Sequence, residues 1–520
     1  MTVRGAGEDL RGSYDQTGKS GMLQEPFGAT SETHSAVVFF AGDRAYKLKK
    51  PVRLGFLDFS TIEARAAACA RETELNRRFA PDVYLGVAEV RDPSGEVCDH
   101  LVVMRRMPAS RRLASLIQAG EHVGSALRQV ARKLAAQHAS AARGAQISAQ
   151  GSRDATRLRW HDNIEQLRTT CGDVIDKSEI DEAAALADRF LAGRQRLFEA
   201  RVDGGHILDG HGDLLAGDIF CLDDGPRILD CLEFDDHLRW VDGLDDAAFL
   251  AMDLEQLGAP QLAEQFTNWY SDFSGDHAPS SLRHHYVAYR AIVRAKVGCV
   301  RALQGDLTVA HEARALAAAA VRHLRAGAVT LVLVGGLPGT GKSALAGELA
   351  GRLGFPVLSS DHVRKELAGI PPDRHDDDGF GAGIYDRSWT DRTYAELLSR
   401  AASLLAMGES VLVDATWTNA DYRTQAASIA AQAMADLVQL QCTAPLPVAA
   451  SRIAGRVGDV SDATPAIAAR LAEEQAPWPE AIVIDTSGEL PSAVLSALDA
   501  IRPHGPEHVW HPVHPYMVPG

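Results

Sequence analysis

The spacing of hydrophobic residues along the chain predicts strand pairs first and helices afterwards. Residues 36–50, AVVFFAGDRAYKLKK, predict two short strands joined by a Gly-Asp turn, as in a hairpin. Residues 60–79 have the pattern of a helix, and residues 83–107 predict a second strand pair. From about residue 113 to residue 200, Ala, Leu and Arg recur at helical spacing.

The pattern changes twice more towards the C-terminus. Residues 206–234 predict a strand–loop–strand segment between helices, which continue to about Ala326. Residues 329–336, VTLVLVGG, are a continuous apolar run, as in a strand buried in a parallel sheet. Further strands are predicted within PVLSSD, SVLVDAT and LVQLQC, and helical stretches separate them. This alternation is typical of an α/β sheet.

These changes of pattern predict four regions. Residues 1–30, rich in Gly, Ser, Thr and charge, predict a flexible arm. Residues 31–326 hold the strand pairs and most helices, and residues 327–495 hold the α/β pattern. Residues 496–520 form a tail rich in Pro and His. No internal repeat relates the two larger regions, which predict different folds.

Composition and charge exclude several classes of protein. The 520 residues, 46% hydrophobic and 23% charged, predict a globular protein of two or three domains. A net charge of -16 argues against a general nucleic-acid binder, which needs a basic surface. The seven cysteines form no Cys-x-x-Cys pair, so neither a zinc site nor a disulfide framework is predicted. We expect a cytoplasmic protein without a membrane segment, since no apolar stretch reaches about 18 residues.

The segment GLPGTGKS, residues 336–343, fits the phosphate-binding pattern G-x-x-x-x-G-K-[ST] between a predicted strand and a predicted helix. Glycines let backbone N–H groups turn towards phosphate oxygens at the positive end of the helix. Lys342 is expected to reach the β- and γ-phosphates of ATP, and Ser343 to bind Mg²⁺. The predicted ATP-binding residues are Gly336, Gly339, Thr340, Gly341, Lys342 and Ser343.

Polar residues at the ends of the following strands extend this site. Asp361 is placed to accept a proton from an acceptor hydroxyl, although it could instead cap the next helix. Arg364 could hold an anionic part of the acceptor, and Asp414 could order the Mg²⁺ shell. Arg452 and Arg456 are four residues apart on one helix face and could clamp the transferring phosphoryl group, or form a surface pair.

These motifs, spread over Val329 to Asp485, resemble those of the small P-loop kinases that include gluconate kinase, polynucleotide kinase and zeta toxin. The resemblance implies an ATP-dependent transfer of phosphate to a hydroxyl group. It does not identify the hydroxyl, because acceptors vary widely within that group.

The segment HGDLLAGD, residues 211–218, followed by ILD ending at Asp230, has the layout of a kinase catalytic loop. In such a loop one Asp takes the acceptor proton, and two further polar residues bind Mg²⁺. This layout makes Asp213 the candidate base, and Asp218 and Asp230 the candidate metal ligands.

This second region resembles the aminoglycoside phosphotransferase family, whose loop commonly reads H-G-D-L-H-x-x-N. The resemblance implies that Lys47 binds phosphate and that Glu72 is its helix partner. Lys49 and Glu74, each two residues further along, are the alternative candidates for these roles. The chain departs from the family pattern at Leu215 and Asp218, and its segment SETHSAVVF contains no glycine-rich loop.

Together the two resemblances imply a fold class: a protein-kinase-like α+β bilobal domain, followed by a P-loop NTPase three-layer α/β domain with a parallel sheet. Similar bacterial proteins fuse an aminoglycoside-phosphotransferase-like domain to a P-loop domain. We expect ATP and Mg²⁺ as cofactors and a small-molecule phosphate acceptor as partner. Two alternatives remain open: a P-loop kinase controlled by an inactive kinase-like sensor, and a kinase acting on nucleic-acid ends.

Overall fold

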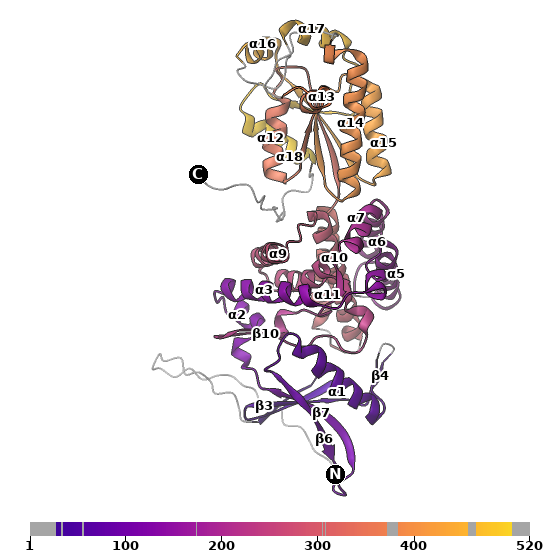
Figure 1. Cartoon of the computed structure of the whole chain (residues 1–520), viewed down its shortest axis with the longest axis vertical. Coiled ribbons are helices and arrows are strands. Elements are labelled where there is room, and N and C mark those ends of the chain that lie inside the picture. Colours follow the sequence, from indigo (N-terminus) through magenta and orange to yellow (C-terminus); the bar gives the residue numbers. More distant parts are fainter. Residues whose placement is uncertain are drawn as a thin grey trace, which may run out of the picture. The chain divides into compact units, whose positions relative to one another are not determined.

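The computed structural model of the chain (Figure 1) contains two compact units. The first consists of the chain up to Ala70 together with Asp82–Pro108, and the second of Arg71–Pro81 together with the chain from Ala109 onward. The structure describes residues 28–32, 35–54, 57–172, 174–303, 305–306, 308–371, 383–455 and 464–501.

The first unit is built on a five-stranded antiparallel sheet in the order β1-β2-β3-β7-β6. Both predicted strand pairs are present, and Gly42, with φ of 57°, forms the turn of the first. The sheet begins at Gly28, inside the range predicted as an arm. The strands of the sheet are β1 (Gly28–Glu32), β2 (Ala36–Ala41), β3 (Arg44–Lys49), β6 (Tyr84–Arg91) and β7 (Val97–Arg105). A separate two-stranded ribbon consists of β4 (Arg53–Leu54) and β5 (Leu57–Asp58). The predicted helix is α1 (Ile62–Arg77).

The first part of the second unit is a helical region that carries two short antiparallel ribbons, β9 with β10 and β8 with β11. Its helices are α2 (Leu113–Gln118), α3 (Gly124–Ser140), α4 (Ala145–Ala149), α5 (Arg153–Thr170), α6 (Lys177–Ala192), α7 (Gln195–Asp203), α8 (Gly243–Gln256), α9 (Pro260–Ser274), α10 (Ser280–Leu303) and α11 (Val309–Ala326). Its strands and 3-10 turns are η1 (Ala109–Arg111), β8 (Ile207–Asp209), η2 (Ala216–Asp218), β9 (Ile219–Leu222), β10 (Gly225–Ile228), η3 (Asp236–Leu238) and β11 (Trp240–Asp242). The long helix α10 packs against α5, α8 and α11.

The rest of the second unit is a five-stranded parallel sheet in the order β13-β14-β12-β15-β16. Every residue of its central strand β12 is buried, as the apolar run predicted. Helices α12 and α18 cover one face and α14 and α15 the other (Figure 1). This arrangement confirms the predicted three-layer α/β domain. Its elements are β12 (Thr330–Gly335), α12 (Lys342–Leu353), β13 (Val357–Ser359), α13 (Ser360–Ala368), η4 (Gly383–Tyr385), α14 (Arg387–Ala406), β14 (Val411–Asp414), α15 (Ala420–Gln432), β15 (Asp436–Thr443), α16 (Leu446–Ala454), α17 (Pro465–Glu474), β16 (Ile482–Asp485) and α18 (Leu490–Ile501).

The helical region and the parallel sheet share one hydrophobic core. Leu197 of α7, Leu331 of β12 and Val413 of β14 all belong to the same buried cluster. The compact units divide the chain at other positions than residue 326, and the domain bounds expected from the sequence stay a prediction. At the other end α18 reaches Ile501, past the boundary predicted at residue 495.

The helices that the structure describes include none with the length and apolar character needed to span a lipid bilayer.

Candidate functional site

The parallel sheet brings three of the predicted motifs to one edge. Asp414, the last residue of β14, pairs with Val334 on one side and with Ser359 on the other. Val334 lies just before the glycine-rich loop, and Ser359 just before Asp361. Since ligands of such sheets bind at the carboxyl ends of the strands, this edge is the candidate nucleotide site.

The glycine-rich loop has a backbone that only glycine adopts readily. Gly336, Gly339 and Gly341 have φ angles of 141°, 82° and 86°. A Cβ at Gly336 would lie 2.6 Å from the carbonyl oxygen of Cys442, and one at Gly339 would lie 2.5 Å from that of Ala449. The loop is therefore closely packed against its neighbours, and its shape depends on these glycines.

Two buried side chains of opposite charge lie near the loop. Lys342 begins α12 and is 8% exposed, and Asp414 is 5% exposed. Burial raises the pKa of the nearby Cys442 thiol to about 12, while the charge of Lys342 opposes this rise and that of Asp414 adds to it. Both charges therefore act at the same place. Ser343, the predicted metal ligand, is exposed in the first turn of α12.

Arg452 of α16 approaches the same loop. Its Nη2 donates to the carbonyl oxygen of Thr486 over 2.7 Å, and the Thr486 hydroxyl donates to the carbonyl oxygen of Thr340. Its Nη1 is buried, has no hydrogen-bond partner among the described residues, and lies 3.5 Å from where a Cβ at Gly341 would be. Of the predicted arginine pair, Arg456 lies outside the residues that the structure describes.

Asp361 and Arg364 lie in α13, next to this edge. The N-cap of the helix is Ser359, and Asp361 is half-buried in the first turn. Arg364 is 6% exposed, and its Nη1 donates to the carbonyl oxygen of Ile384 over 2.8 Å and to the Thr390 hydroxyl over 3.2 Å. Arg364 therefore connects α13 to η4 and α14, and acceptor binding by this residue stays a prediction.

A buried tyrosine that the sequence analysis missed lies near Asp361 and Arg364. The hydroxyl of Tyr394 accepts from the backbone N–H of Trp417 over 3.2 Å and lies 3.3 Å from the Thr416 hydroxyl. Burial raises the pKa of Tyr394, the charge of Arg364 lowers it and that of Asp361 raises it. Tyr394 comes from the middle of α14, and no local motif marks it.

The second predicted site, the loop after β8, is held by one buried carboxylate. Asp246 of α8 accepts the backbone N–H of His211 over 2.7 Å and that of Gly212 over 2.8 Å. His138 Nε2 lies 3.0 Å from the same carboxylate. Burial alone would raise the pKa of Asp246, but the hydrogen bond and charge of His138 hold it below its usual value. The Asp246 carboxylate thus holds the backbone of the loop at His211 and Gly212 in place.

Asp213, the candidate base, is half-buried directly after this anchored segment. Burial raises its pKa to about 6, the nearby charges of Arg294 and Arg290 lower it, and those of Asp230 and Asp253 raise it. A carboxyl group with a pKa near neutrality can take up and release a proton during turnover.

Asp218 and Asp230 stand at the open end of the β9–β10 hairpin. Ile219 pairs with Ile228, and the backbone N–H of Leu229 donates to the carbonyl oxygen of Asp218 over 3.0 Å. Asp230 is exposed and has a φ of 63°, a left-handed conformation that is costly for a residue other than glycine. The hairpin therefore places both predicted metal ligands at one end.

Two arginines of α10, Arg290 and Arg294, lie near this loop and differ in their contacts. Arg290 donates from Nε and Nη2 to the two carboxylate oxygens of Asp245, over 2.7 Å and 2.9 Å, and all of these atoms are buried. Arg290 is therefore held by an ion pair. Arg294, one turn along α10, acts on Asp213 through its charge. Asp246 and Asp253, which also act at this site, carried no signal in the sequence.

The candidates for the phosphate-binding lysine and for its glutamate partner differ in how deeply they are buried. In the first unit, Lys47 and Lys49 share a face of β3, Lys49 is buried at 2% exposure, and its ammonium lies 4.9 Å from the centre of the Phe59 ring. In the second unit, Glu72 is fully buried, whereas Glu74 pairs with Arg71 at the surface over 2.9 Å. The assignment of Lys47 and Glu72 stays a prediction.

Metal binding at either site does not rest on a preformed cluster. No group of three or more His, Cys, Asp or Glu residues that could hold a metal ion occurs within the described ranges. The assignment of Ser343, Asp414, Asp218 and Asp230 as Mg²⁺ ligands stays a prediction.

Comparisons with known proteins found one matching family and several similar solved structures. A family described as an AAA domain matches residues 331–478. A gluconokinase from Sinorhizobium meliloti 1021 is 22% identical, with a TM-score of 0.25, and the match covers 33% of this chain and 91% of that one. A choline/ethanolamine kinase family protein from Mesorhizobium loti is 16% identical, with a TM-score of 0.35, and the match covers 58% of this chain and 92% of that one.

A relative matches nearly the whole chain. The uncharacterized protein Rv2004c of Mycobacterium tuberculosis is 45% identical over 489 residues, which cover 94% of this chain and 96% of the relative. At this identity and coverage, the chain belongs to the same protein family as Mycobacterium tuberculosis Rv2004c.

Proposed function

We propose that the chain is an ATP- and Mg²⁺-dependent phosphotransferase with two kinase-type sites, each moving the γ-phosphate of ATP to a hydroxyl group of a small molecule. The observation that carries the proposal is the meeting of Lys342, Asp414 and Arg452 around the glycine-rich loop. Three residues from distant parts of the sequence thus place two positive charges and one carboxylate near the loop.

The residues of the loop fit a bound nucleoside triphosphate. The positive φ angles of Gly336, Gly339 and Gly341 give the loop a backbone in which successive N–H groups can turn towards a phosphate. The buried Nη1 of Arg452 has no acceptor among the described residues, and a phosphate oxygen beside Gly341 would provide one. Mg²⁺-ATP, when bound, supplies the transferable phosphoryl group and a cation that offsets its charge.

Each side chain at this edge has a role in the proposal. Lys342 and Arg452 bind phosphate oxygens and stabilise the charge that develops during transfer. Ser343 and Asp414 hold Mg²⁺ through their oxygens. Asp361 accepts the proton of the acceptor hydroxyl, which makes that oxygen the better nucleophile.

The middle site supports the second half of the proposal. Asp213, with its pKa raised to about 6 chiefly by burial, is ionised at neutral pH and can accept the proton of a hydroxyl group. Asp218 and Asp230 bind Mg²⁺ at the end of the hairpin, and the conformation of Asp230 is maintained despite its cost.

A second candidate function is a P-loop kinase controlled by the kinase-like region. It is favoured by the hydrophobic core that joins α7 to β12 and β14, because a change in the helical region would reach the sheet through that packing. In this case the middle region binds a ligand without turning over ATP.

Consumption of Mg²⁺-ATP with a panel of sugars, aminoglycosides, nucleosides and oligonucleotide ends tests the proposal. Lys342→Ala removes the charge at the glycine-rich loop, and Asp213→Asn removes the base of the middle site. Matched controls are Arg352→Ala, an exposed cation at the other end of α12, and Asp223→Asn, an exposed carboxylate in the β9–β10 turn.

Each pattern of results selects one function. If the two site variants lose turnover with different acceptors while the controls keep it, the proposal holds and both acceptors are identified. If only Lys342→Ala loses turnover, the middle region is a sensor. Turnover that survives both substitutions would show that the sites have been assigned wrongly.

A further inference from the structure

The left-handed backbone of Asp230 is enclosed by hydrogen bonds to the residues around it. Leu229, directly before it, donates its N–H to the carbonyl oxygen of Asp218 over 3.0 Å, and its own carbonyl oxygen lies 3.1 Å from Nε2 of His211. Leu232, two residues after it, donates its N–H to the carbonyl oxygen of His211 over 3.1 Å. The backbone is therefore fixed on both sides of the exposed, strained Asp230.

The residue directly after Asp230 is held by a side chain of helix α1. Asn76 is 0% exposed, and its Oδ1 accepts the backbone N–H of Cys231 over 2.8 Å. Its Nδ2 donates to the carbonyl oxygen of Glu72 over 2.9 Å and to that of Cys231 over 3.4 Å. Because a backbone N–H can only donate, the bond to Cys231 also fixes which end of the amide is the oxygen. The buried amide thus has a partner at each end.

Asn76 joins two residues assigned to the middle site. One is Glu72, fully buried one turn earlier in α1, and the other is Asp230. Arg78, directly after α1, adds to the connection, because its Nη2 donates to the carbonyl oxygen of Gly210 over 3.0 Å. All of these residues belong to the second unit. The end of α1 therefore holds both the loop after β8 and the segment that follows Asp230.

We propose that Asn76 is a positioning residue for Asp230, acting through the bond to Cys231. This inference rests on the proposed function, in which Asp230 binds Mg²⁺. A strained backbone conformation persists only where the surrounding structure enforces it. Without Asn76 the Cys231 N–H loses its acceptor, and the peptide after Asp230 is free to turn and carry the carboxylate away from the metal. Loss of a group that orients a metal ligand typically weakens metal binding by about 10–100-fold.

Binding of Mn²⁺ to the full-length chain, followed by electron paramagnetic resonance with a non-hydrolysable ATP analogue present, tests the proposal. A Lys342→Ala background weakens nucleotide binding at the glycine-rich loop, so the middle site dominates the signal. Asn76→Ala should weaken Mn²⁺ binding by about 10–100-fold, and Asp230→Asn, which removes the ligand itself, by at least as much. Asn76→Asp keeps an acceptor for the Cys231 N–H and should retain the affinity of the background.

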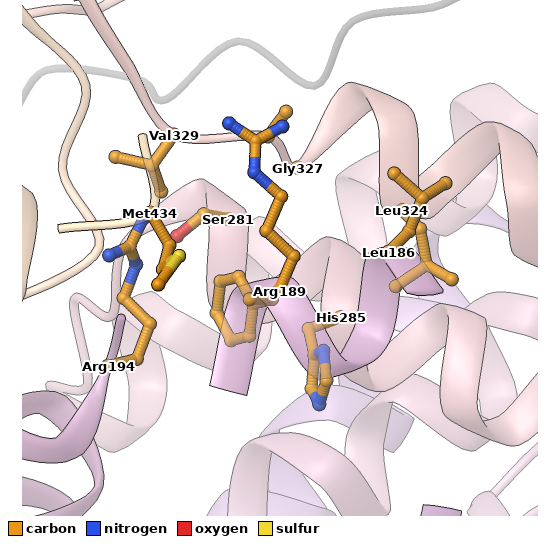
Figure 2. Close-up of a pocket in the computed structure, with 11 residues that line it drawn as sticks. Leu186, Arg189, Arg194, Ser281, His285, Leu324, Gly327, Val329 and Met434 are labelled. Atoms are coloured by element: carbon orange, nitrogen blue, oxygen red, sulfur yellow. The ribbon is translucent and has the colours of Figure 1, made fainter. Parts of the chain in front are cut away.

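Asn163→Ala is the matched control for a purely structural loss. Asn163 of α5 is 8% exposed, and its Nδ2 donates to the carbonyl oxygen four residues earlier in its helix over 2.7 Å, as that of Asn76 does. On the same helix, Trp160 donates to His285 over 3.0 Å. His285 lines a small cavity at the junction with the parallel sheet, with room for about one or two waters (Figure 2). The control should lose stability but keep the Mn²⁺ affinity of the background.

Hydrogen exchange of the amides of residues 229–232 is a second readout, and it needs no metal. Asn76→Ala should speed exchange in this segment roughly tenfold, the effect of losing one hydrogen bond, whereas Asp230→Asn and Asn163→Ala should leave it unchanged. Asn76→Ser covers the case in which Asn76→Ala fails to fold. Its hydroxyl can bond to the Glu72 carbonyl within the helix but is too short to reach Cys231, so the same two losses are expected.

The two readouts separate failure of the inference from failure of the proposed function. The positioning role is overturned if residues 229–232 exchange in the Ala and Ser variants as in the background. It is also overturned if these variants bind Mn²⁺ as tightly as Asn163→Ala does, or if Asn76→Asp binds it as weakly as Asn76→Ala. Unchanged Mn²⁺ binding in Asp230→Asn is a different result. It overturns the proposed Mg²⁺ site itself, and the positioning role with it, even where exchange shows that Asn76 holds the segment.

Discussion

The glycine-rich loop and the middle loop, the two sites proposed for phosphate transfer, are shaped in different ways. The first is shaped by its backbone: three glycines with positive φ follow one another within a few residues, and at Gly336 and Gly339 neighbouring carbonyl oxygens leave no room for a side chain. The second is shaped by a side chain distant in sequence, since Asp246 of α8 accepts hydrogen bonds from the backbone of His211 and Gly212. The first site is therefore defined within a short segment, and the second by tertiary structure.

This difference predicts how each site fails. The glycine-rich loop is shaped by its own backbone, so it should keep its shape when a charged side chain beside it is removed. Such a substitution should therefore affect turnover and not folding. A loop that depends on a buried carboxylate should lose both when that carboxylate is removed.

The largest effect is expected for Asp246→Ala. The substitution leaves the N–H groups of His211 and Gly212 and the ring of His138 buried without their acceptor, which should lower the free energy of unfolding by about 3–5 kcal/mol. Chemical denaturation followed by circular dichroism measures this change. Turnover at the middle site should disappear with it.

Asp253→Ala is the matched control for this prediction. Asp253 accepts a single N–H, that of Ala216, over 2.8 Å, so its loss should cost about 1–3 kcal/mol. If Asp246→Ala unfolds no more easily than Asp253→Ala, the middle loop does not depend on the buried carboxylate as described.

The second prediction concerns Arg452→Gln. The variant loses a charged donor beside the glycine-rich loop, and removal of one such donor typically lowers turnover about 10²-fold. Stability should fall by only about 1 kcal/mol, the value of one hydrogen bond to Thr486. Steady-state ATP consumption and thermal unfolding measure the two effects. Arg470→Gln, on the exposed surface of α17, should change neither. A parallel loss of stability and turnover would instead make Arg452 a structural residue.

The third prediction is a pH dependence confined to the middle site. Because the pKa of Asp213 is about 6, turnover at this site should fall about tenfold per pH unit below pH 6 and level off above it. Arg294→Met should move the midpoint upward, since the charge of Arg294 lowers the pKa of Asp213. A midpoint near pH 4 in the wild type would contradict the burial of Asp213.

The same shift has a consequence for stability. The pKa of Asp213 is raised from 3.8 to about 6 on folding, so the folded chain binds the proton more tightly. This contribution is fully present below pH 4 and is lost as the pH rises through 6. Asp213→Asn should therefore be more stable than the wild type at pH 7.5 by about 1–3 kcal/mol, and no more stable at pH 4.

The sequence predicted the parts of both sites that local pattern encodes. The glycine-rich loop needs backbone angles that only glycine supplies, so its residues are visible as a motif. Asp361 and Asp414 were found because strand ends in a parallel sheet share an edge. Tyr394, Asp246 and Asp253 were missed because each lies within an ordinary helix and reaches its site only through tertiary packing.

The fold was predicted to a similar depth. Alternating strands and helices gave the parallel sheet, and two strand pairs gave the antiparallel one. Composition cannot show that Leu197, Leu331 and Val413, from both sides of residue 326, pack into one core.

The smallest effect is expected at the junction between the helical region and the sheet, for Asp436→Asn. Arg189 and Asp436 are 41% and 44% exposed, so solvent screens their pair, and its loss should cost less than about 1 kcal/mol. The pair should weaken further as salt rises, and turnover at both sites should stay unchanged. Thermal unfolding at low and high salt measures this. Leu197→Ala, at the buried core of the same junction, should cost about 2–5 kcal/mol. If the loss of the surface pair proved the more costly of the two, charge and not the shared hydrophobic core would hold the helical region and the sheet together.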